Sequence, residues 1–597
     1  MWQKFSALWK KTHFKLVNHR FSIEKVVKVM SLLITLGAVT CIVMQHGCYL
    51  TPSQEKWTTT FVFTAYLFYI FKFFLRWTYG GGVVKYLKEN KLELVIILIP
   101  LLMGIFNHQF QKLFSIPEDL FPHYRQLFFH VYYFVIFFVE IAKVSKQVQK
   151  LNLSPPVLMM ISFFVLIVSG TGLLLLPKMT VNGISFADAL FTSTSASCVT
   201  GLTVVNTAAC FTTTGHIVLM LLMQMGGMSI LSFATFFISF LSKSYTGLKY
   251  QYMVKDMLDT NRADSFSFLR EIILVTFVIE GSGALLLYMY WRTTGLFATD
   301  GETILFALFH AISAFNNAGF SLWNEGLMDT AVVNSHFPQM IIMLLVFVGG
   351  IGYVVLRDFF DPRVIRERKR KRWMKLTDGT QIALITSFAI IVVGTVLFFF
   401  LERSNVLAKE STFDKIFSSV FQVVAGRTAG FNIVNVDQMR IPTLLLFIVI
   451  IFIGASPGST GGGIKTTTFF VIIKSILATI RGKSKIEYRK KTIPFQLVDK
   501  SYSIVVMSLV MIIISLFLLA IIDPQIPLKN LMFETTSAFT TCGLSTGCID
   551  QFSVAGKLVL TFNMYIGRIG TLTFAYALSK RIKESRHEYP ETSFMVG

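Results

Sequence analysis

Long apolar segments recur along the whole chain, separated by short polar or basic segments. Four of them lie near the amino terminus, at about residues 27–46, 58–76, 92–107 and 127–145. From Pro155 onward, each long apolar segment is followed by a shorter half-polar segment, a second apolar segment and a basic connection. An apolar segment of roughly 17–25 residues can cross a bilayer as a helix. The pattern therefore predicts an all-α membrane protein with four extra amino-terminal spans.

The pattern after Pro155 repeats four times, which indicates an internal repeat. Each copy has a glycine in a polar segment, spaced 118, 111 and 113 residues apart: Gly201, Gly319, Gly430 and Gly543. More glycines follow at intervals of 25, 30, 24 and 24 residues: Gly226-Gly227, Gly349-Gly350, Gly454 and Gly567. We interpret the chain as four helix–pore-loop–helix repeats around a central pore. The predicted domains are 1–150, 151–250, 251–375, 376–498 (with a broken inner helix) and 499–597.

Basic residues account for a formal net charge of +22, and they cluster in the connections. The connections near 243–262, 357–375 and 481–500 are basic, as are both ends of the chain. Positive charge gathers on the cytoplasmic side of membrane proteins, so we expect cytoplasmic termini in a multi-pass protein of the plasma membrane. This distribution argues against a nucleic-acid partner. Segments 363–375 and 481–491 are candidate docking surfaces for a protein or for anionic lipid.

The glycine-bearing segments are polar and non-helical, and such a backbone is tolerated at membrane depth only where it lines a cavity. Four of them around one axis would offer a ring of carbonyl oxygens that replaces the water shell of a cation. Half-length helices, such as Phe186 to Thr194 and Ile304 to Ser313, would point their negative carboxyl ends at that cation. Close helix packing is the alternative role for the glycines. The candidate filter residues are Val199, Thr200, Gly201, Asn317, Ala318, Gly319, Thr428, Ala429, Gly430, Thr541, Cys542 and Gly543.

The third inner helix is interrupted between Ile453 and Phe470 by a proline and several glycines. This composition breaks a helix and suits a gate. The stretch 458–466 is close to a phosphate-binding loop, but an isoleucine precedes the lysine and no strand–helix context surrounds it. We therefore predict no nucleotide site there. The candidate gate residues are Gly458, Ser459, Thr460, Gly461, Gly462, Gly463, Lys465 and Arg568.

Arg568 lies inside the fourth inner helix, where a charge is costly and commonly functional. We expect it to face the pore below the filter, next to the glycine-rich loop. Its alternative role is a structural pairing with a buried carboxylate or with loop carbonyls. Glu280 and Glu534 are candidate partners or anchors of the pore helices. Cys210 and Cys548 would lie on the outer face, and whether they pair stays open.

These residues resemble the bacterial potassium-uptake subunits of the Trk and Ktr type, whose plant relatives are the HKT transporters. The resemblance covers roughly residues 154–583. In that family, all-glycine filters go with potassium and a serine at the first position goes with sodium, so the four glycines here imply potassium. The resemblance further implies a loop that blocks the path below the filter. It also implies a homodimer on a cytoplasmic ring of separate nucleotide-binding regulatory subunits.

We therefore expect potassium uptake through a gated, channel-like path. Inward movement of a cation gains about 2.3 kcal/mol per 100 mV of membrane potential, so no catalytic site or cofactor is needed. Ten scattered histidines without metalloprotease spacing argue against a membrane enzyme. Two alternatives within transport stay open. They are a cation-coupled potassium or sodium symporter and the channel-like subunit of a potassium-importing ATPase.

Overall fold

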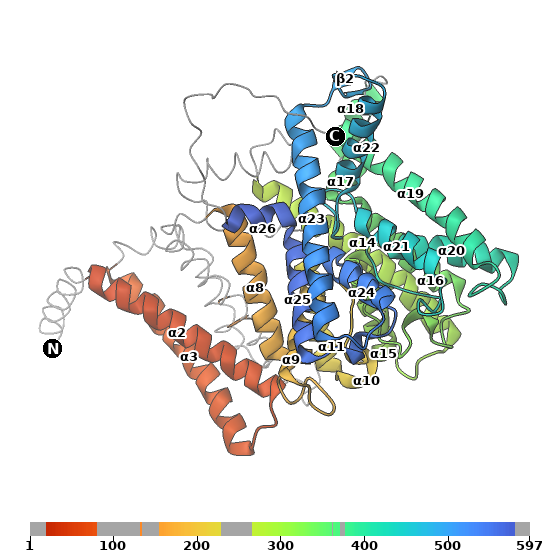
Figure 1. The fold of residues 1–597 in the computed structure, drawn as a ribbon. Helices are drawn as coiled ribbons and strands as arrows, with labels where there is room; N and C mark the ends of the chain where they lie inside the picture. Colours follow the sequence, from red (N-terminus) through yellow and green to blue (C-terminus); the bar gives the residue numbers. More distant parts are fainter. Residues whose placement is uncertain are drawn as a thin grey trace, which may run out of the picture.

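The computed structural model describes residues 20–79, 132–133, 136, 154–228, 265–360, 362–370 and 376–578 (Figure 1). These parts are almost entirely helical, and their one small sheet is the hairpin β1 (Glu487–Tyr488) and β2 (Lys491–Thr492). Six of the described helices are long and apolar enough to cross a membrane, and two further bent pairs qualify if each counts as one span. The chain is therefore a multi-pass membrane protein. The predicted spans 92–107 and 127–145 lie outside the described residues, except for 132–133 and 136.

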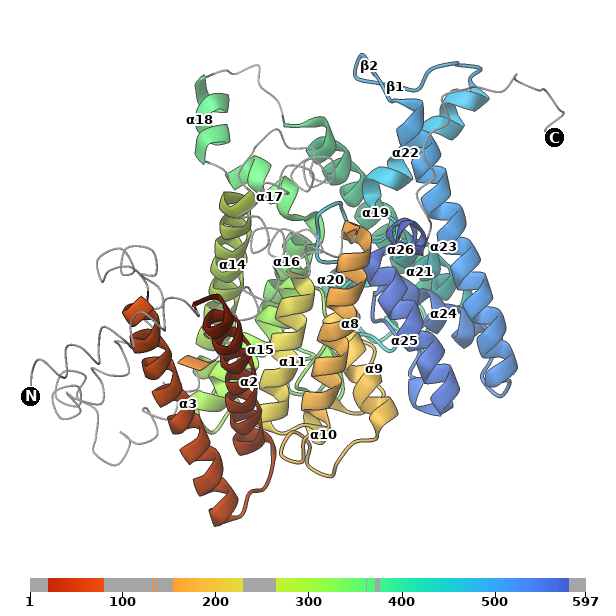
Figure 2. The ribbon, with the colours of Figure 1, turned by 90° about the vertical axis from the view of Figure 1, so that its left-hand side faces the viewer.

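The first two predicted spans are helices α2 (Arg20–Gly47) and α3 (Pro52–Tyr79), which pack side by side next to the repeats (Figures 1 and 2). The carboxyl end of α2 contacts the first repeat. The amide of Lys178 donates to the Gly47 carbonyl at 2.8 Å, and its ammonium donates to the Gln45 carbonyl at 3.2 Å. A cation at a helix carboxyl end is favourable, because the last carbonyls there are otherwise unsatisfied. This contact joins the amino-terminal pair to the first repeat.

Each repeat begins with a long outer helix, continues with a shorter pore helix and ends with an inner helix. The outer helices are α8 (Pro155–Leu174), α14 (Ser265–Thr294), α19 (Asp378–Glu402) and α23 (Phe495–Ile522). The pore helices are α9 (Phe186–Ser197), α15 (Asp300–Phe315), α20 (Thr412–Gly426) and α24 (Leu528–Thr540). The inner helices are α11 (Thr213–Gly227), α16 (His336–Ile351), α21 (Ile441–Ile453) and α25 (Val554–Ile569). A short helix, α10 (Thr207–Cys210), and two single turns (Gly326–Met328 and Ile549–Gln551) lie between pore and inner helices.

Side chains near the start of three pore helices fix where these helices begin. Ser185, Thr299 and Ser411 each accept a hydrogen bond from the backbone amide three residues later, which is the usual cap of a helix amino terminus. Asp188 of α9 also forms an ion pair with Lys557 of α25 at 2.7 Å. That pair ties the first repeat to the fourth.

Three inner helices end at a glycine with positive φ, whereas only the third was predicted to break. Gly352 (φ 92°) separates α16 from α17 (Tyr353–Phe360) with a bend of 98°. Gly570 (φ 91°) separates α25 from α26 (Thr571–Leu578) with a bend of 93°. Gly454 (φ 56°) ends α21, and the chain resumes as α22 (Thr466–Ile480). The second and fourth inner helices turn as well, because a single glycine suffices to turn the backbone out of the helix.

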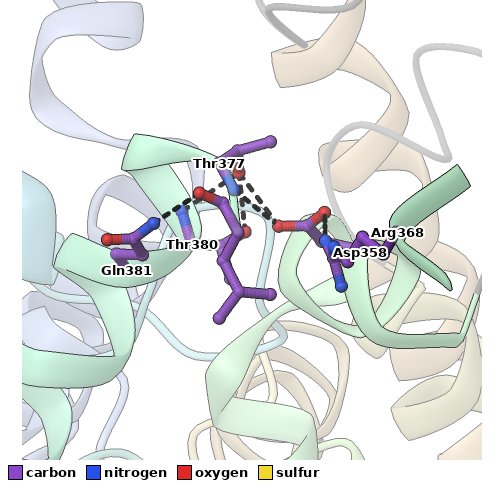
Figure 3. Close-up of polar contacts among 6 residues, drawn as sticks. Asp358, Arg368, Thr377, Thr380 and Gln381 are labelled. Atoms are coloured by element: carbon purple, nitrogen blue, oxygen red, sulfur yellow. Dashed lines mark hydrogen bonds and ion pairs between the residues drawn. The ribbon is translucent and has the colours of Figure 1, made fainter. Parts of the chain in front are cut away.

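The basic connection after the second repeat is folded rather than a loop. It contains the end of α17 and the helix α18 (Pro362–Arg370), so its prediction as a loop was wrong. Figure 3 shows how Asp358 holds this region together. One carboxylate oxygen accepts from Arg368 of α18, and the other accepts from the amide of Thr377 at 3.0 Å, just before α19 begins. In Figures 1 and 2, α17, α18 and the β-hairpin lie at one end of the molecule, and α10 lies toward the other.

Candidate functional site

The four predicted filter glycines form a closed ring. A β-carbon placed on each would contact the carbonyl oxygen that precedes the next glycine: Gly201 meets Ala318, Gly319 meets Ala429, Gly430 meets Cys542 and Gly543 meets Thr200. The same β-carbons would lie only 3.0 to 3.2 Å from the Cα of the next glycine. All four glycines have positive φ, between 70° and 93°. Both the crowding and the backbone angle therefore require glycine at these positions.

In repeats one, two and four, the residue two positions before the filter glycine has a left-handed backbone conformation. These residues are Val199, Asn317 and Thr541, with φ of 57°, 59° and 51°. The next amide donates to a serine carbonyl of the pore helix over 2.7–2.9 Å, in the pairs Thr200–Ser195, Ala318–Ser313 and Cys542–Ser537. The hydroxyls of Ser195 and Ser537 accept from the amides of Gly201 and Gly543 at 3.1 and 3.2 Å. The amides of these segments thus bond backward to the pore helices, while carbonyls remain at the ring.

The third repeat departs from this arrangement. Thr428 is not among the residues with positive φ, and the amides of Ala429 and Gly430 both donate to the Ala425 carbonyl, at 2.8 and 3.2 Å. The residue that caps the carboxyl end of this pore helix is Arg427, which is buried. The Thr428 hydroxyl forms a 2.8 Å hydrogen bond with the side-chain carboxamide of Asn317 in the second repeat. All four predicted segments nevertheless meet at one ring.

The second set of glycines packs the inner helices against the pore helices. Gly226, Gly349 and Gly567 each lie against the carbonyl at or next to the end of a pore helix, in the pairs Gly226–Ser197, Gly349–Phe315 and Gly567–Phe539. Each of these carbonyls lies four residues before a filter glycine. This packing explains why the second set of glycines follows the filter glycines at similar intervals. Gly454 is different, because it lies against Gly462 and Gly463 of its own loop. Close packing is thus the role of the second set.

The connection between α21 and α22, residues 454–465, contains the predicted gate residues 458–463 and Lys465, and it lies against the predicted filter segments. A β-carbon on Gly461 would meet the Thr428 hydroxyl at 2.6 Å, and one on Gly462 would meet the Thr540 carbonyl at 2.6 Å. Four polar contacts hold the loop to the second repeat. The amide of Thr460 donates to the Gly349 carbonyl at 3.5 Å. The amide of Ser456 donates to the Gly350 carbonyl at 3.0 Å, the amide of Tyr353 donates to the Gly458 carbonyl at 3.0 Å, and the Thr460 hydroxyl donates to the Phe315 carbonyl at 3.4 Å. Ser459 is buried, and Gly458 and Gly463 both have a φ of 71°.

Arg568 bridges this loop to the first repeat. It is buried, and its two terminal nitrogens donate to the carbonyls of Thr460 in the loop and Gly226 in α11. One acceptor thus lies in the loop and the other in α11, and within the described residues no carboxylate forms an ion pair with Arg568. Lys465 is half-buried and donates to the Gly461 carbonyl at 2.6 Å, within the loop. Both cations therefore bind backbone oxygens of the loop.

The two glutamates anchor pore helices instead of pairing with Arg568. Glu280 of α14 accepts from the side chain of Asn316, which caps α15, at 2.8 Å. Glu534 of α24 is fully buried and accepts from the amide of Thr546 at 2.6 Å and from the hydroxyls of Thr546 and Ser545 at 2.9 and 2.8 Å. Glu534 thus holds the segment that follows the fourth ring glycine, Gly543, against the pore helix α24.

The cysteines Cys210 and Cys548 are both free thiols. Burial raises the pKa of the Cys210 thiol, and the nearby Asp188 carboxylate adds to this shift.

Within the described residues no group of three or more His, Cys, Asp or Glu side chains could hold a metal ion.

Sequence reasoning missed four residues that shape this site. Gly352 and Gly570 turn the second and fourth inner helices, and the short motifs GGIG and GRIG around them are the signal that was available. Arg427 and Ser387 contact the start of the 454–465 loop, at Gly454 and Ser456. Arg427 was detectable as a charge beside a filter segment, whereas nothing in the pattern marks Ser387.

The fold is that of an α-helical membrane protein in which an outer helix, a shorter helix and an inner helix recur four times. A family model described as "Cation transport protein", TrkH, matches residues 124–588 of the chain. The chain therefore belongs to the TrkH family. It is 36% identical over 461 residues to the Ktr system potassium uptake protein B of Bacillus subtilis, covering 76% of this chain and 99% of that protein.

Two further comparisons agree with this assignment. The potassium/sodium uptake protein NtpJ of Enterococcus hirae is 32% identical over 463 residues, covering 76% of this chain and 99% of that protein. The crystal structure of the potassium transporter TrkH from Vibrio parahaemolyticus superposes with a TM-score of 0.60 at 16% identity. That superposition covers 81% of this chain and 97% of the other, so the two share a fold. The first 123 residues lie outside the family match.

Proposed function

We propose that this chain takes up potassium across the plasma membrane through the ring formed by Gly201, Gly319, Gly430 and Gly543. The closed ring is the observation that carries the proposal. Carbonyl oxygens that meet around an axis can replace the hydration shell of a cation without any charged side chain. The relatives from Bacillus subtilis and Enterococcus hirae are named as potassium and potassium/sodium uptake proteins.

The 454–465 loop would act as the gate. It lies against Thr428 and Thr540 at the filter, and the buried guanidinium of Arg568 adds a positive charge beside it. A cation approaching this point meets both an occluding backbone and an unfavourable field. Gly458 and Thr460 also line a cavity of about 30 Å³, which has room for roughly one water molecule. Opening would require the contacts of Arg568 with the loop to break.

Flux through such a path would be channel-like and driven by membrane potential. The assembly that we propose is a homodimer with separate cytoplasmic nucleotide-binding subunits, and both termini in the cytoplasm. The basic helix α18 is a candidate contact for such a subunit, because Asp358 connects it to α17 and α17 contacts the loop at Gly458. This chain needs no catalytic residue for the proposed activity.

Sodium is the second candidate ion. A relative of 32% identity is named for both ions, and the sodium transporter HKT1 of Arabidopsis thaliana is 23% identical over 459 residues. All four ring positions are glycine, and none is the serine that goes with sodium among the Trk, Ktr and HKT proteins. Potassium therefore remains the favoured ion.

Flux of single ions into liposomes tests the proposal. The purified protein would be reconstituted, and uptake of potassium and sodium would be compared at the same imposed membrane potential. We expect potassium uptake to exceed sodium uptake by about tenfold or more, which corresponds to a difference of about 1.4 kcal/mol in barrier. Uptake that requires a sodium or proton gradient would favour the symporter instead. No flux of either ion under any gradient would overturn the proposal.

A further inference from the structure

The third repeat places a buried guanidinium where its sister repeats have uncharged residues. Three positions before the filter glycine the repeats carry Cys198, Asn316, Arg427 and Thr540, all of them buried. Within the described ranges no carboxylate forms an ion pair with Arg427, and its Nε has no hydrogen-bond partner. A buried charge without a counter-ion is costly, so it is retained only where its remaining contacts matter.

Those contacts lie at Ser387 of the outer helix α19 and at Gly454, where the 454–465 loop begins. The Nη2 of Arg427 donates to the Ser387 hydroxyl of α19 at 3.0 Å and lies 3.5 Å from the carbonyl oxygen of Gly454, where the loop begins. The Ser387 hydroxyl lies 3.3 Å from that of Ser456, and the Thr466 hydroxyl, at the start of α22, donates to Ser456 at 3.3 Å. One chain of hydrogen bonds thus connects a pore helix, an outer helix and both ends of the loop.

The direction of these bonds follows from the chemistry of the groups. A guanidinium can only donate, so Ser387 accepts from Arg427 and its own proton is free to donate to Ser456. Ser456 accepts from Thr466 and shares a second hydrogen bond with Ser387. Ser387, Ser456 and Thr466 are all at most 1% exposed, so water does not compete for these bonds. Loss of the guanidinium would remove the charged donor that orders the chain of hydroxyls.

We propose that Arg427 is a positioning residue that, through Ser387, clamps the two ends of the 454–465 loop together below the filter. The residue after Arg427 is Thr428, which packs against Gly461 of the same loop. Arg427 therefore acts on the base of the loop, and Arg568 holds its middle at Thr460. The regulatory consequence, a leak on release of the clamp, rests on the proposed role of the loop as a gate.

Amide hydrogen exchange of the full chain in lipid nanodiscs tests the clamp without measuring flux. The variants are Ser387→Ala, which leaves the filter untouched, and Arg427→Gln, with Ser501→Ala as the control. Ser501 is a similarly buried serine on the outer helix α23, and its hydroxyl bonds only to its own helix. We expect exchange in residues 454–466 to rise about tenfold in both test variants, since each loses a bond that depends on a charged donor. Exchange in α8 should stay unchanged and reports an intact fold.

Loop exchange at the wild-type rate in a folded Ser387→Ala protein overturns the clamp, and this arm holds even if Arg427→Gln fails to fold. Faster loop exchange together with raised potassium flux in liposomes supports both the clamp and the gate. Faster loop exchange with unchanged flux supports the clamp and removes the loop from gating, so the two ideas fail separately.

Discussion

Gly430 of the third repeat faces the carbonyl oxygen of Cys542 of the fourth so closely that a β-carbon on Gly430 would lie 2.8 Å from that oxygen. The φ of Gly430 is 73°, which adds backbone strain for any other residue. The same relationship holds around the ring, so each glycine is required by its neighbour and not only by its own backbone.

Replacing Gly430 with alanine should therefore lower potassium uptake by about tenfold or more, because the methyl group pushes apart two filter segments. Growth of a potassium-uptake-deficient bacterium at low potassium, with membrane expression checked, measures this effect. Gly281→Ala is the matched control, since Gly281 lies in α14 with nothing within 4 Å of an added β-carbon. Normal growth of the Gly430→Ala strain would contradict a tight ring.

Arg568→Ala should raise potassium flux, because it removes both a positive charge beside the path and the bond to the Thr460 carbonyl. A rise of about tenfold would correspond to a barrier lower by about 1.4 kcal/mol. Liposome flux measures it, with the exposed Arg292→Ala as the control. Unchanged flux in a well-folded Arg568→Ala protein would remove this residue from the gate.

Glu534→Ala should destabilise the fourth filter segment. The change leaves the Thr546 amide and the two hydroxyls of Thr546 and Ser545 without their common acceptor, at a cost of about 2–4 kcal/mol. We expect a lower melting temperature in detergent and a reduced preference for potassium over sodium. Glu302→Ala, an exposed position on the pore helix α15, should change neither quantity. Wild-type selectivity in Glu534→Ala would show that this anchor does not shape the filter.

A chain lacking residues 1–123 should still take up potassium. The Bacillus subtilis relative is matched over 99% of its own length by 76% of this chain, and the family match begins at residue 124. The α2 contact at Lys178 lies on a connection after α8, away from the ring. Uptake by the truncated chain in liposomes checks this expectation. Its failure in a monodisperse, folded preparation would assign the amino-terminal helices a direct part in transport.

The four repeats and the ring glycines were predictable from the sequence. The positive φ and the close contacts at these positions require glycine, and glycine recurs there at similar spacing in all four repeats. The pore helices were predictable as well; α9 runs from Phe186 to Ser197, three residues beyond its predicted end at Thr194. The bends at Gly352 and Gly570 were missed, because the apolar pattern continues across them and only the short motifs GGIG and GRIG mark the change of direction.

Long-range hydrogen bonds were beyond the sequence pattern. Arg427 and Ser387 are 40 residues apart, and neither lies in a periodic motif that would bring them together. Glu534 was named as an anchor without its partners, since a buried carboxylate needs donors but its sequence neighbours do not reveal which ones it takes. The helix at 362–370 was not predicted, because its many basic residues are equally typical of an exposed connection.

The most direct test of the account is the position of the ion. An electron cryo-microscopy map of the full protein in potassium, compared with one in choline, should show a peak on the axis among the carbonyl oxygens of Thr200, Ala318, Ala429 and Cys542 that is absent in choline. A map in potassium with the four glycines in their ring and no ion among those carbonyls would contradict the central claim.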